Sequence, residues 1–266
     1  MRNLLSFLLV SISVLLCSCN SRQFSNGKPV TQTHTIQKTF KVLMMYDDVD
    51  VHLIPDGTHS STTISITAGE NIIDNITDTI IGDTLIIHNE NTLNWLRDYD
   101  SPKRMEIHYD SIQRIIFESN GKLTNQDSLS GKHYQNSHET TASYLYLDIK
   151  GGSGDIDLTV NPNILKATFD EGTSSVTFKG KVNYAETTTK YDSHGPINAQ
   201  YLYTNQHVVS HRGTNIAKVR AKGYLTINNY NNGTVYYVKY KDIPDQGIYY
   251  PEYTNLMGPC IYAIYE

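Results

Sequence analysis

The chain has 266 residues, a formal net charge of −5 and only 18% charged residues. No nucleic-acid partner is expected from this mildly acidic composition, because phosphate recognition needs a concentrated basic surface. The 20 tyrosines, against 6 phenylalanines and 1 tryptophan, together with many β-branched and turn-forming residues, predict an all-β fold.

Residues 1–18 predict a lipoprotein signal peptide. Arg2 supplies a positive charge, and Leu4 to Leu16 form an apolar stretch that is too short to span a bilayer as a mature helix. The "LCSC" that ends it resembles a bacterial lipobox, in which the small Ser18 precedes the cut and Cys19 receives the lipid. The open alternative is an ordinary signal peptide whose cysteines are incidental. We expect a chain acylated at Cys19, for example with palmitate, in the bacterial cell envelope, at the periplasm-facing side of the outer membrane.

Removal of Cys17 with the signal peptide and acylation of Cys19 leave Cys260 as a single cysteine. No intramolecular disulfide is then available, so packing and backbone pairing have to hold the fold. Cys260 lies in the apolar "PCIYAIY" and is expected to be a buried, unreactive thiol. Residues 19–35 are polar without apolar periodicity, which predicts a flexible spacer between the anchor and the folded domain.

Alternating apolar residues begin at Ile36 and predict a series of short strands. Two of these strands are separated by Asp47-Asp48, and a turn follows at residues 55–57. The pattern breaks at residues 124–141, a polar insertion with one Leu and one Tyr. This insertion is expected to be a mobile surface loop.

A glycine-led turn followed by a β-branched residue recurs through residues 144–240. The units are spaced by 20, 21, 19 and 19 residues and end at Ile156, Val176, Ile197, Ile216 and Val235. A constant period near twenty is typical of a solenoid, in which stacked coils bury a continuous core. We therefore predict a right-handed β-helix or β-solenoid with coils of about 20 residues over residues 36–240. The five β-branched residues are expected to form one inward-facing ladder.

The order of these motifs resembles a known family. The stretch "DVDVHL", the segment "GENIIDNITDTIIGDTLIIHNENTLNWL" and the Gly-Ser-Gly-type repeats are similar, in that order, to the auto-transporter adhesin, head GIN domain, family of bacterial envelope lipoproteins. The resemblance covers roughly residues 36–240. It implies an all-β, β-helix-like fold, an envelope or secreted location and no catalytic residues. The insertion at 124–141 and the Tyr-rich segment 241–266, expected to be a C-terminal cap, depart from the family pattern.

Two patterns resemble metal sites without predicting one. In "GGSGDIDLT", Ile156 stands where a calcium-binding nonapeptide has its aspartate, and Asp157 follows one position late, in a single copy. His207 and His211 would share one face of a helix, but in a strand they lie about 13 Å apart. We expect neither a metal nor a cofactor.

Stacking the repeats on the inward ladder places charged residues in two rows on the outside. The first row contains Lys166, Glu186 and His207, and the second Asp170, Lys190 and His211. Opposite charges alternate along both rows, which is typical of structural cross-strand pairs. Lysine neighbours would also keep the carboxylates ionised, which disfavours a general acid and hence a glycosidase. We expect a partner-binding face here, formed by Glu186, Lys190, His207 and His211.

Four Asp-Ser/Thr-aliphatic triplets resemble an O-glycosylation sequon of Gram-negative bacteria. Their acceptor residues are Thr79, Thr84, Ser111 and Ser128. The alternative is that these are ordinary turn residues before a strand, which any β-rich chain contains.

These patterns together predict a non-enzymatic envelope lipoprotein that acts as an adhesion or binding module for a glycan or protein ligand. The first alternative is a structural or regulatory envelope protein that contacts only partner proteins, and the second is a carbohydrate-active β-helix enzyme. Exposed tyrosines along a groove would favour glycan binding, whereas a flat ladder of charges would favour protein contact. A clustered, unpaired pair of carboxylates would favour the enzyme.

Overall fold

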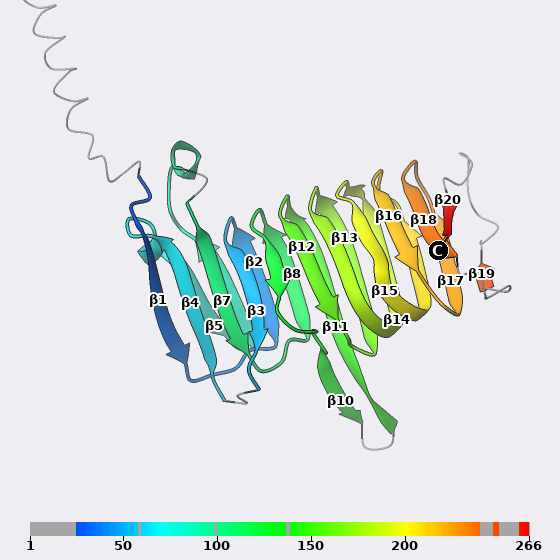
Figure 1. Ribbon diagram of the computed structural model, residues 1–266, viewed down its shortest axis with the longest axis horizontal. Coiled ribbons are helices and arrows are strands. Elements are labelled where there is room, and N and C mark those ends of the chain that lie inside the picture. Colours follow the sequence, from blue (N-terminus) through cyan, green and yellow to red (C-terminus); the bar gives the residue numbers. More distant parts are fainter. Residues whose placement is uncertain are drawn as a thin grey trace, which may run out of the picture.

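The computed structural model describes residues 25–57, 60–98, 101–136, 139–239, 247–249 and 261–265. Figure 1 shows its strands stacked side by side into one elongated body, with the N-terminal strands at one end and the C-terminal strands at the other. These residues contain no α-helix, and two 3-10 helices, η2 (Ile73–Asn75) and η3 (Asn94–Leu96), lie between strands. The predicted all-β fold is confirmed.

The described residues form twenty strands. Those that begin before the polar insertion are β1 (Pro29–Ile36), β2 (Val42–Asp47), β3 (Asp50–Pro55), β4 (Thr62–Gly69), β5 (Ile76–Ile81), β6 (Thr84–Asn89), β7 (Lys103–Tyr109), β8 (Arg114–Ser119) and β9 (Leu123–Asn125). Those that follow are β10 (Lys132–Asn136), β11 (Glu139–Gly152), β12 (Asp155–Val160), β13 (Ile164–Gly172), β14 (Ser175–Ser193), β15 (Ile197–His211), β16 (Ile216–Arg220), β17 (Tyr224–Asn229), β18 (Thr234–Lys239), β19 (Gly247–Tyr249) and β20 (Ile261–Tyr265).

Two parallel ladders of strands run along the body. The first ladder has the order β6, β2, β8, β11, β13, β14, β15, β17, β19. The second ladder has the order β7, β3, β9, β12, β14, β15, β16, β18, β20. Because β14 and β15 are long enough to pair in both, they join the two ladders without a break. From β11 to β18, each repeat of about twenty residues therefore contributes one stretch of strand to each ladder.

Inward-facing side chains of both ladders form one continuous hydrophobic core. The predicted inward positions Ile156, Val176, Ile197 and Val235 are buried, as expected. The prediction is wrong for Ile216, which is 47% exposed. The adjacent Ala217 takes the inward position opposite Ile197. Ala217 lies twenty residues after Ile197 and Ile216 only nineteen, and a shift of one residue moves a side chain to the other face.

The predicted spacer at residues 19–35 is wrong over its second half, because residues 29–36 form β1. This strand pairs antiparallel with β4 and covers the edge of the sheet at its N-terminal end. Cross-strand hydroxyl pairs such as Thr31–Thr67 (2.8 Å) and Thr33–Ser65 (2.9 Å) connect the two strands. A strand that is polar on both faces has no hydrophobic alternation, so the sequence pattern could not reveal it.

The sequence predicted a mobile surface loop at residues 124–141, and the structure shows that this prediction is wrong for part of the insertion. Its first residues belong to β9, and the side chain of Asn125 exchanges two hydrogen bonds with the backbone of Thr159 (2.8 and 2.9 Å). Leu129 is 1% exposed and forms a bridge to Val160. The remainder enters the antiparallel pair of β10 and β11, which projects from one side of the body in Figure 1.

Several sequence predictions lie outside the described residues. These are the signal peptide at residues 1–18, the lipid-bearing Cys19 and the buried thiol of Cys260. Of the predicted cap at 241–266, the described parts are β19 and β20, which add one further strand to the first and second ladder respectively.

Candidate functional site

The outer surface of the first ladder carries ion pairs between neighbouring strands, and we call it the paired-charge face. Its contacts are Arg114–Asp148 (2.5 Å), Lys150–Asp170 (2.5 Å), Lys190–Asp170 (2.8 Å) and Lys166–Glu186 (2.9 Å). Two of the four residues predicted to bind a partner, Glu186 and Lys190, lie here. Both are already engaged by a neighbour on the adjacent strand.

The other two predicted residues, His207 and His211, lie in the core rather than on this face, so that part of the prediction is wrong. Their exposed fractions are 1% and 0%. The repeat pattern placed His207 beside Glu186 and His211 beside Lys190. In the structure His207 pairs with Ala185 and His211 with Thr189, one residue earlier in each case. The cause is one additional residue at a bulge in β15 after Asn198, which turns the following side chains to the opposite side.

Both imidazoles are satisfied inside the core. Each ring donates one N–H to a backbone carbonyl oxygen and accepts a hydrogen bond from a threonine hydroxyl. The partners of His207 are Arg220 (3.2 Å) and Thr187 (3.0 Å), and those of His211 are Asn215 (3.0 Å) and Thr189 (3.0 Å). Burial lowers the pKa of His207 to about 4 and also lowers the pKa of His211, although the carbonyl contacts act in the opposite direction. Both rings are therefore neutral structural groups at pH 7.

The carboxylates of the paired-charge face are poorly suited to acid catalysis. Burial alone would raise the pKa of Asp170, but hydrogen bonds from Lys150 and Lys190 outweigh it and hold the pKa below its usual value. A general acid needs the opposite shift. Glu186 is bonded to Lys166, so neither carboxylate forms an unpaired acid and base couple.

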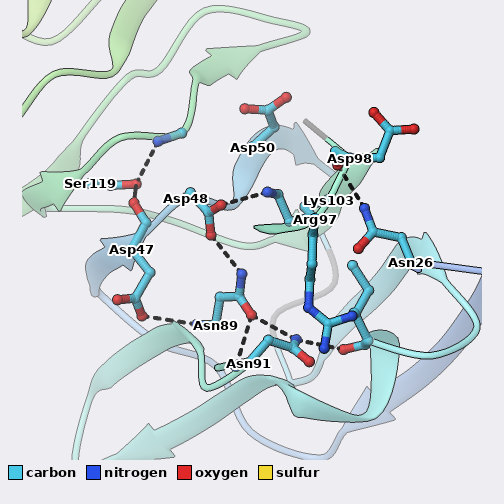
Figure 2. Close-up of polar contacts among 12 residues, drawn as sticks. Asn26, Asp47, Asp48, Asp50, Asn89, Asn91, Arg97, Asp98, Lys103 and Ser119 are labelled. Carbon is cyan, nitrogen blue, oxygen red and sulfur yellow. Dashed lines mark hydrogen bonds and ion pairs between the residues drawn. The ribbon is translucent and has the colours of Figure 1, made fainter. Parts of the chain in front are cut away.

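A second polar cluster occupies the corner between β2 and β3 and is drawn in Figure 2. Asp47, with φ of 60°, accepts a hydrogen bond from the backbone N–H of Asn89 (2.9 Å), and Asp48 accepts one from the side chain of Asn89 (2.6 Å). Lys103 forms an ion pair with Asp48 (2.5 Å), and the Asn91 amide donates to Asn89 (2.7 Å). Because N–H donors satisfy the carboxylates of Asp47 and Asp48, this network is a structural one that ties β2 and β3 to β6 and β7.

The glycine-rich "GGSGDIDLT" forms the turn from β11 into β12. Asp157, which the calcium pattern would need one position earlier, bonds to Lys179 (2.8 Å). Among the residues that the structure describes, no group of three or more His, Cys, Asp or Glu side chains is placed to hold a metal ion.

The four predicted glycosylation acceptors lie near the N-terminal half of the body. Thr79 is exposed on β5, and Thr84 is half-buried at the start of β6. Ser111 and Ser128 are half-buried and line the same hollow of about 80 Å³ beside Tyr109.

The outer surface of the second ladder, in its C-terminal half, has a different character. Cationic and aromatic side chains gather there, and we call them the basic tyrosine face: Lys181, Tyr201, Tyr203, Lys218 and Lys222, with the buried Arg220 (4% exposed) in contact with the ring of Tyr203. Tyr201 and Tyr203 are 52% and 53% exposed. The parts of β14, β15, β16 and β18 that build this side of the second ladder contain no Asp or Glu. The face is therefore a local basic region on a protein whose net charge is −5.

The basic tyrosine face contains a hollow of about 360 Å³ where the second ladder turns into the first. It is lined by Lys181, Val182, Tyr203, Thr204, Asn205 and Lys222. The guanidinium of Arg220 lies 4.5 Å from the ring centroid of Tyr203, a cation–π contact that fixes the ring. Gly180 enters this corner with φ of 107°, and a Cβ there would come within 2.2 Å of the Val160 carbonyl oxygen.

Two adjacent coils of unequal length create this hollow. Nine residues lead from Ile197 in the second ladder to Gln206 in the first, whereas seven lead from Ala217 to Tyr224 on the neighbouring coil. The longer segment remains paired with β14, and its two tyrosines alternate with the buried Leu202 and Thr204, so their side chains face outward.

The repeat pattern did not reveal the basic tyrosine face, although the sequence carries a signal for it. Residues 193–241 contain no Asp or Glu, in a chain that has 27 of them. Over the same stretch lysine and arginine continue at their usual frequency. A charge profile along the chain, rather than the hydrophobic repeat, would have identified the region.

A second hollow, of about 260 Å³, lies at the N-terminal end of the second ladder. Asp50, His52, Arg104, Lys122 and Thr124 line it together with Val51. Charges of both signs meet there, and Arg104 is paired with Glu106 (2.8 Å). This hollow lacks both the exposed aromatic rings and the single sign of charge that distinguish the basic tyrosine face.

Comparison with solved structures shows that the fold is shared. A protein described as a putative adhesin from Bacteroides fragilis matches with a TM-score of 0.65 and 16% identity, over 91% of this chain and 94% of that one. A protein described as a putative lipid binding protein from Parabacteroides distasonis matches with a TM-score of 0.60 and 14% identity, over 90% of this chain and 98% of that one. No curated protein matches the chain.

The family expected from the order of motifs is confirmed independently. The sequence model described as "Putative auto-transporter adhesin, head GIN domain" matches residues 39–240, from Thr39 to the end of the repeats. This span includes the two parallel ladders up to β17 and β18, the paired-charge face and the basic tyrosine face. The protein therefore belongs to the auto-transporter adhesin, head GIN domain, family.

Proposed function

We propose that this protein is a non-enzymatic binding module of the bacterial envelope, which holds its ligand on the basic tyrosine face. The observation that carries the proposal is the contrast between the two surfaces of the body. Charges on the first ladder neutralise one another, whereas the C-terminal part of the second ladder presents Lys181 and Lys222 without a carboxylate beside the exposed rings of Tyr201 and Tyr203. Unpaired charge and exposed aromatic area are the features that distinguish a binding surface from an ordinary one.

The architecture that we propose for this module is a right-handed β-solenoid with coils of about twenty residues. The two continuous parallel ladders and the shared strands β14 and β15 support it. A solenoid offers long side surfaces with a regular spacing of about 4.8 Å per coil, which suits an extended ligand.

Ligand position can be tested by photo-crosslinking in living cells. A photoreactive amino acid at Tyr201 is expected to capture envelope material, whereas the same group at Thr168 on the paired-charge face is expected to capture little. Digestion of the adducts by protease or by glycan-degrading enzymes then separates a protein partner from a glycan. Equal capture from both positions would contradict the proposed face. Cleavage of a captured glycan by the purified protein would favour the enzyme alternative.

We further propose that the chain is anchored through acylated Cys19 at the periplasm-facing side of the outer membrane. None of the helices in the described part of the chain is long and apolar enough to cross a membrane. Each buried methylene of an acyl chain contributes about 0.8 kcal/mol to membrane binding, so two or more chains anchor a protein stably.

Replacing Cys19 by Ala is expected to release the protein from the membrane fraction, or to leave it uncleaved and held by its signal peptide. Intact mass of the wild type should show a chain that begins at Cys19 with added acyl mass. Cys17→Ala is the matched control and should leave both the mass and the fractionation unchanged. A mature chain that begins elsewhere and carries no lipid would exclude the anchor.

A further inference from the structure

We infer that the hollow of the basic tyrosine face binds an acidic polysaccharide, an extended chain of sugars that carry carboxylate or sulfate groups. This inference rests on the proposed function and adds the class of ligand. One sugar ring would lie against Tyr203, and its acidic group would lie between Lys181 and Lys222.

The charge of the hollow comes from its two lysines. Lys181 and Lys222 form no ion pair with any of the described residues, whereas Lys150, Lys166 and Lys190 on the paired-charge face all do. Two ammonium groups at one hollow without a carboxylate repel each other, and an anion placed between them removes that repulsion. An acidic ligand is the complement that this arrangement lacks.

The aromatic part is held ready for a flat ring. Tyr203 is more than half exposed, yet the guanidinium of Arg220 fixes its orientation. A ring that is already immobile loses little conformational entropy when a ligand stacks on it. Tyr201, two residues earlier on the same coil, offers a second exposed ring.

Amide side chains beside the hollow suit sugar hydroxyl groups. Asn205 donates from its Nδ2 to the Oδ1 of Asn183 (2.8 Å), and both residues are exposed. This contact uses one donor and one acceptor and leaves the Oδ1 of Asn205 and the Nδ2 of Asn183 directed to the surroundings. A hydroxyl group can both donate and accept, so it can bond to this pair.

The geometry favours a polysaccharide over a membrane. The hollow is concave, and two lysines, an asparagine, a threonine and a tyrosine line it together with Val182. A lipid surface would instead be met by a flat or convex apolar patch rich in Trp, Phe and Leu. Successive coils advance by about 4.8 Å, similar to the advance per sugar of an extended polysaccharide, so neighbouring sugars can meet neighbouring coils.

The test measures binding of polymers to the full-length protein in detergent. Polygalacturonate and dextran sulfate supply the carboxylate and the sulfate, dextran supplies the neutral sugar, and polyglutamate supplies charge without a sugar ring. We expect at least one of the two acidic polysaccharides to bind at least tenfold more tightly than dextran or polyglutamate. Binding should also weaken as salt is raised, because ion contacts are screened.

Variants locate the site. Lys181→Gln with Lys222→Gln is expected to weaken binding of the acidic polysaccharide at least tenfold, and Tyr203→Ala at least fivefold. The matched control is Lys166→Gln with Lys190→Gln on the paired-charge face, which removes the same charge and should change affinity by less than twofold. Thermal melting of each variant establishes that it remains folded.

Several results would overturn the inference. These are equal loss in the control variant, equal binding of dextran or polyglutamate, or tighter binding of oligothymidylate or of phosphatidylglycerol vesicles than of either acidic polysaccharide. If crosslinking from Tyr201 still captures envelope material while both acidic polysaccharides fail to bind, the ligand class is wrong and the proposed function stands. If neither is seen, both are wrong.

Discussion

Replacing Ile197 by Asp is expected to unfold the protein. Ile197 is 1% exposed, and its neighbours on the adjacent coils are Val176 and Ala217. A carboxylate there has no partner, and burial of an unpaired charge together with the lost apolar contact costs about 5 kcal/mol. Stabilities of natural domains are about 5–15 kcal/mol, so the substitution removes from about one third to all of the free energy of unfolding. Circular dichroism during heating should show no cooperative transition, or one lowered by more than about 10 °C.

The matched control is Ile216→Asp. Ile216 is also a β-branched residue at the start of a strand, and the repeat pattern places it in the same ladder, but it is 47% exposed. Its replacement should change the free energy of unfolding by no more than about 0.5 kcal/mol. Similar melting temperatures for the two variants would contradict the register in which Ala217, rather than Ile216, faces the core.

Stability is expected to fall as the pH is lowered from about 6.5 to about 4, because His207 is buried in its neutral form. Its pKa is about 4 in the folded protein and 6.5 in the unfolded chain. The unfolded chain therefore binds more protons between these values, and the free energy of unfolding rises with pH across that window. The contribution of His207 is fully present above pH 6.5, and about 2.5 kcal/mol of it is lost at pH 4.5. The lowered pKa of His211 acts in the same direction.

Urea unfolding at pH 7.5 and pH 4.5 measures this loss, and His207→Gln identifies its source. A glutamine can donate to the Arg220 carbonyl oxygen and accept from the Thr187 hydroxyl, as the neutral imidazole does, but it does not titrate. The variant should lose less stability than the wild type between the two pH values. His194→Gln, at an exposed histidine, is the control and should retain the full loss. An unchanged pH dependence in His207→Gln would show that other groups cause it.

Sequence patterns predicted the strands whose two faces differ. Alternation of apolar and polar residues identified the two strands on either side of Asp47-Asp48 and the inward positions of Ile156 and Val176, because burial of one face produces that alternation. β1 has no buried face, and its threonines bond across to β4 through hydroxyl groups, so its sequence looks like that of a linker. Leu129 is a single apolar residue in a polar stretch. Its burial could not be predicted, because one residue gives no periodic pattern of hydrophobicity.

The candidate site was harder to predict because small irregularities decide it. One residue at the bulge after Asn198 turned His207 and His211 from the surface into the core. A repeat averaged over several coils cannot carry this information, since the bulge changes one coil only. The pairing of Lys166 with Glu186 was predicted, because the register of β13 and β14 is unbroken from Ile164 to Phe169 and shifts only after these residues.

The unequal lengths of the coils at the hollow bear on how such proteins diversify. Between Ile197 and Gln206 one extra residue is accommodated at the bulge after Asn198, and the pairing of β14 with β15 resumes at Tyr201, so both ladders continue although the side chains that follow change sides. Corner length thus acts as a variable that is separable from the core, much as loop length does on an immunoglobulin sandwich. Members of one family can keep the same stack of coils and differ in where, and how far, a coil protrudes. New recognition surfaces could then arise by short insertions at corners, without the loss of stability that accompanies substitutions in the core.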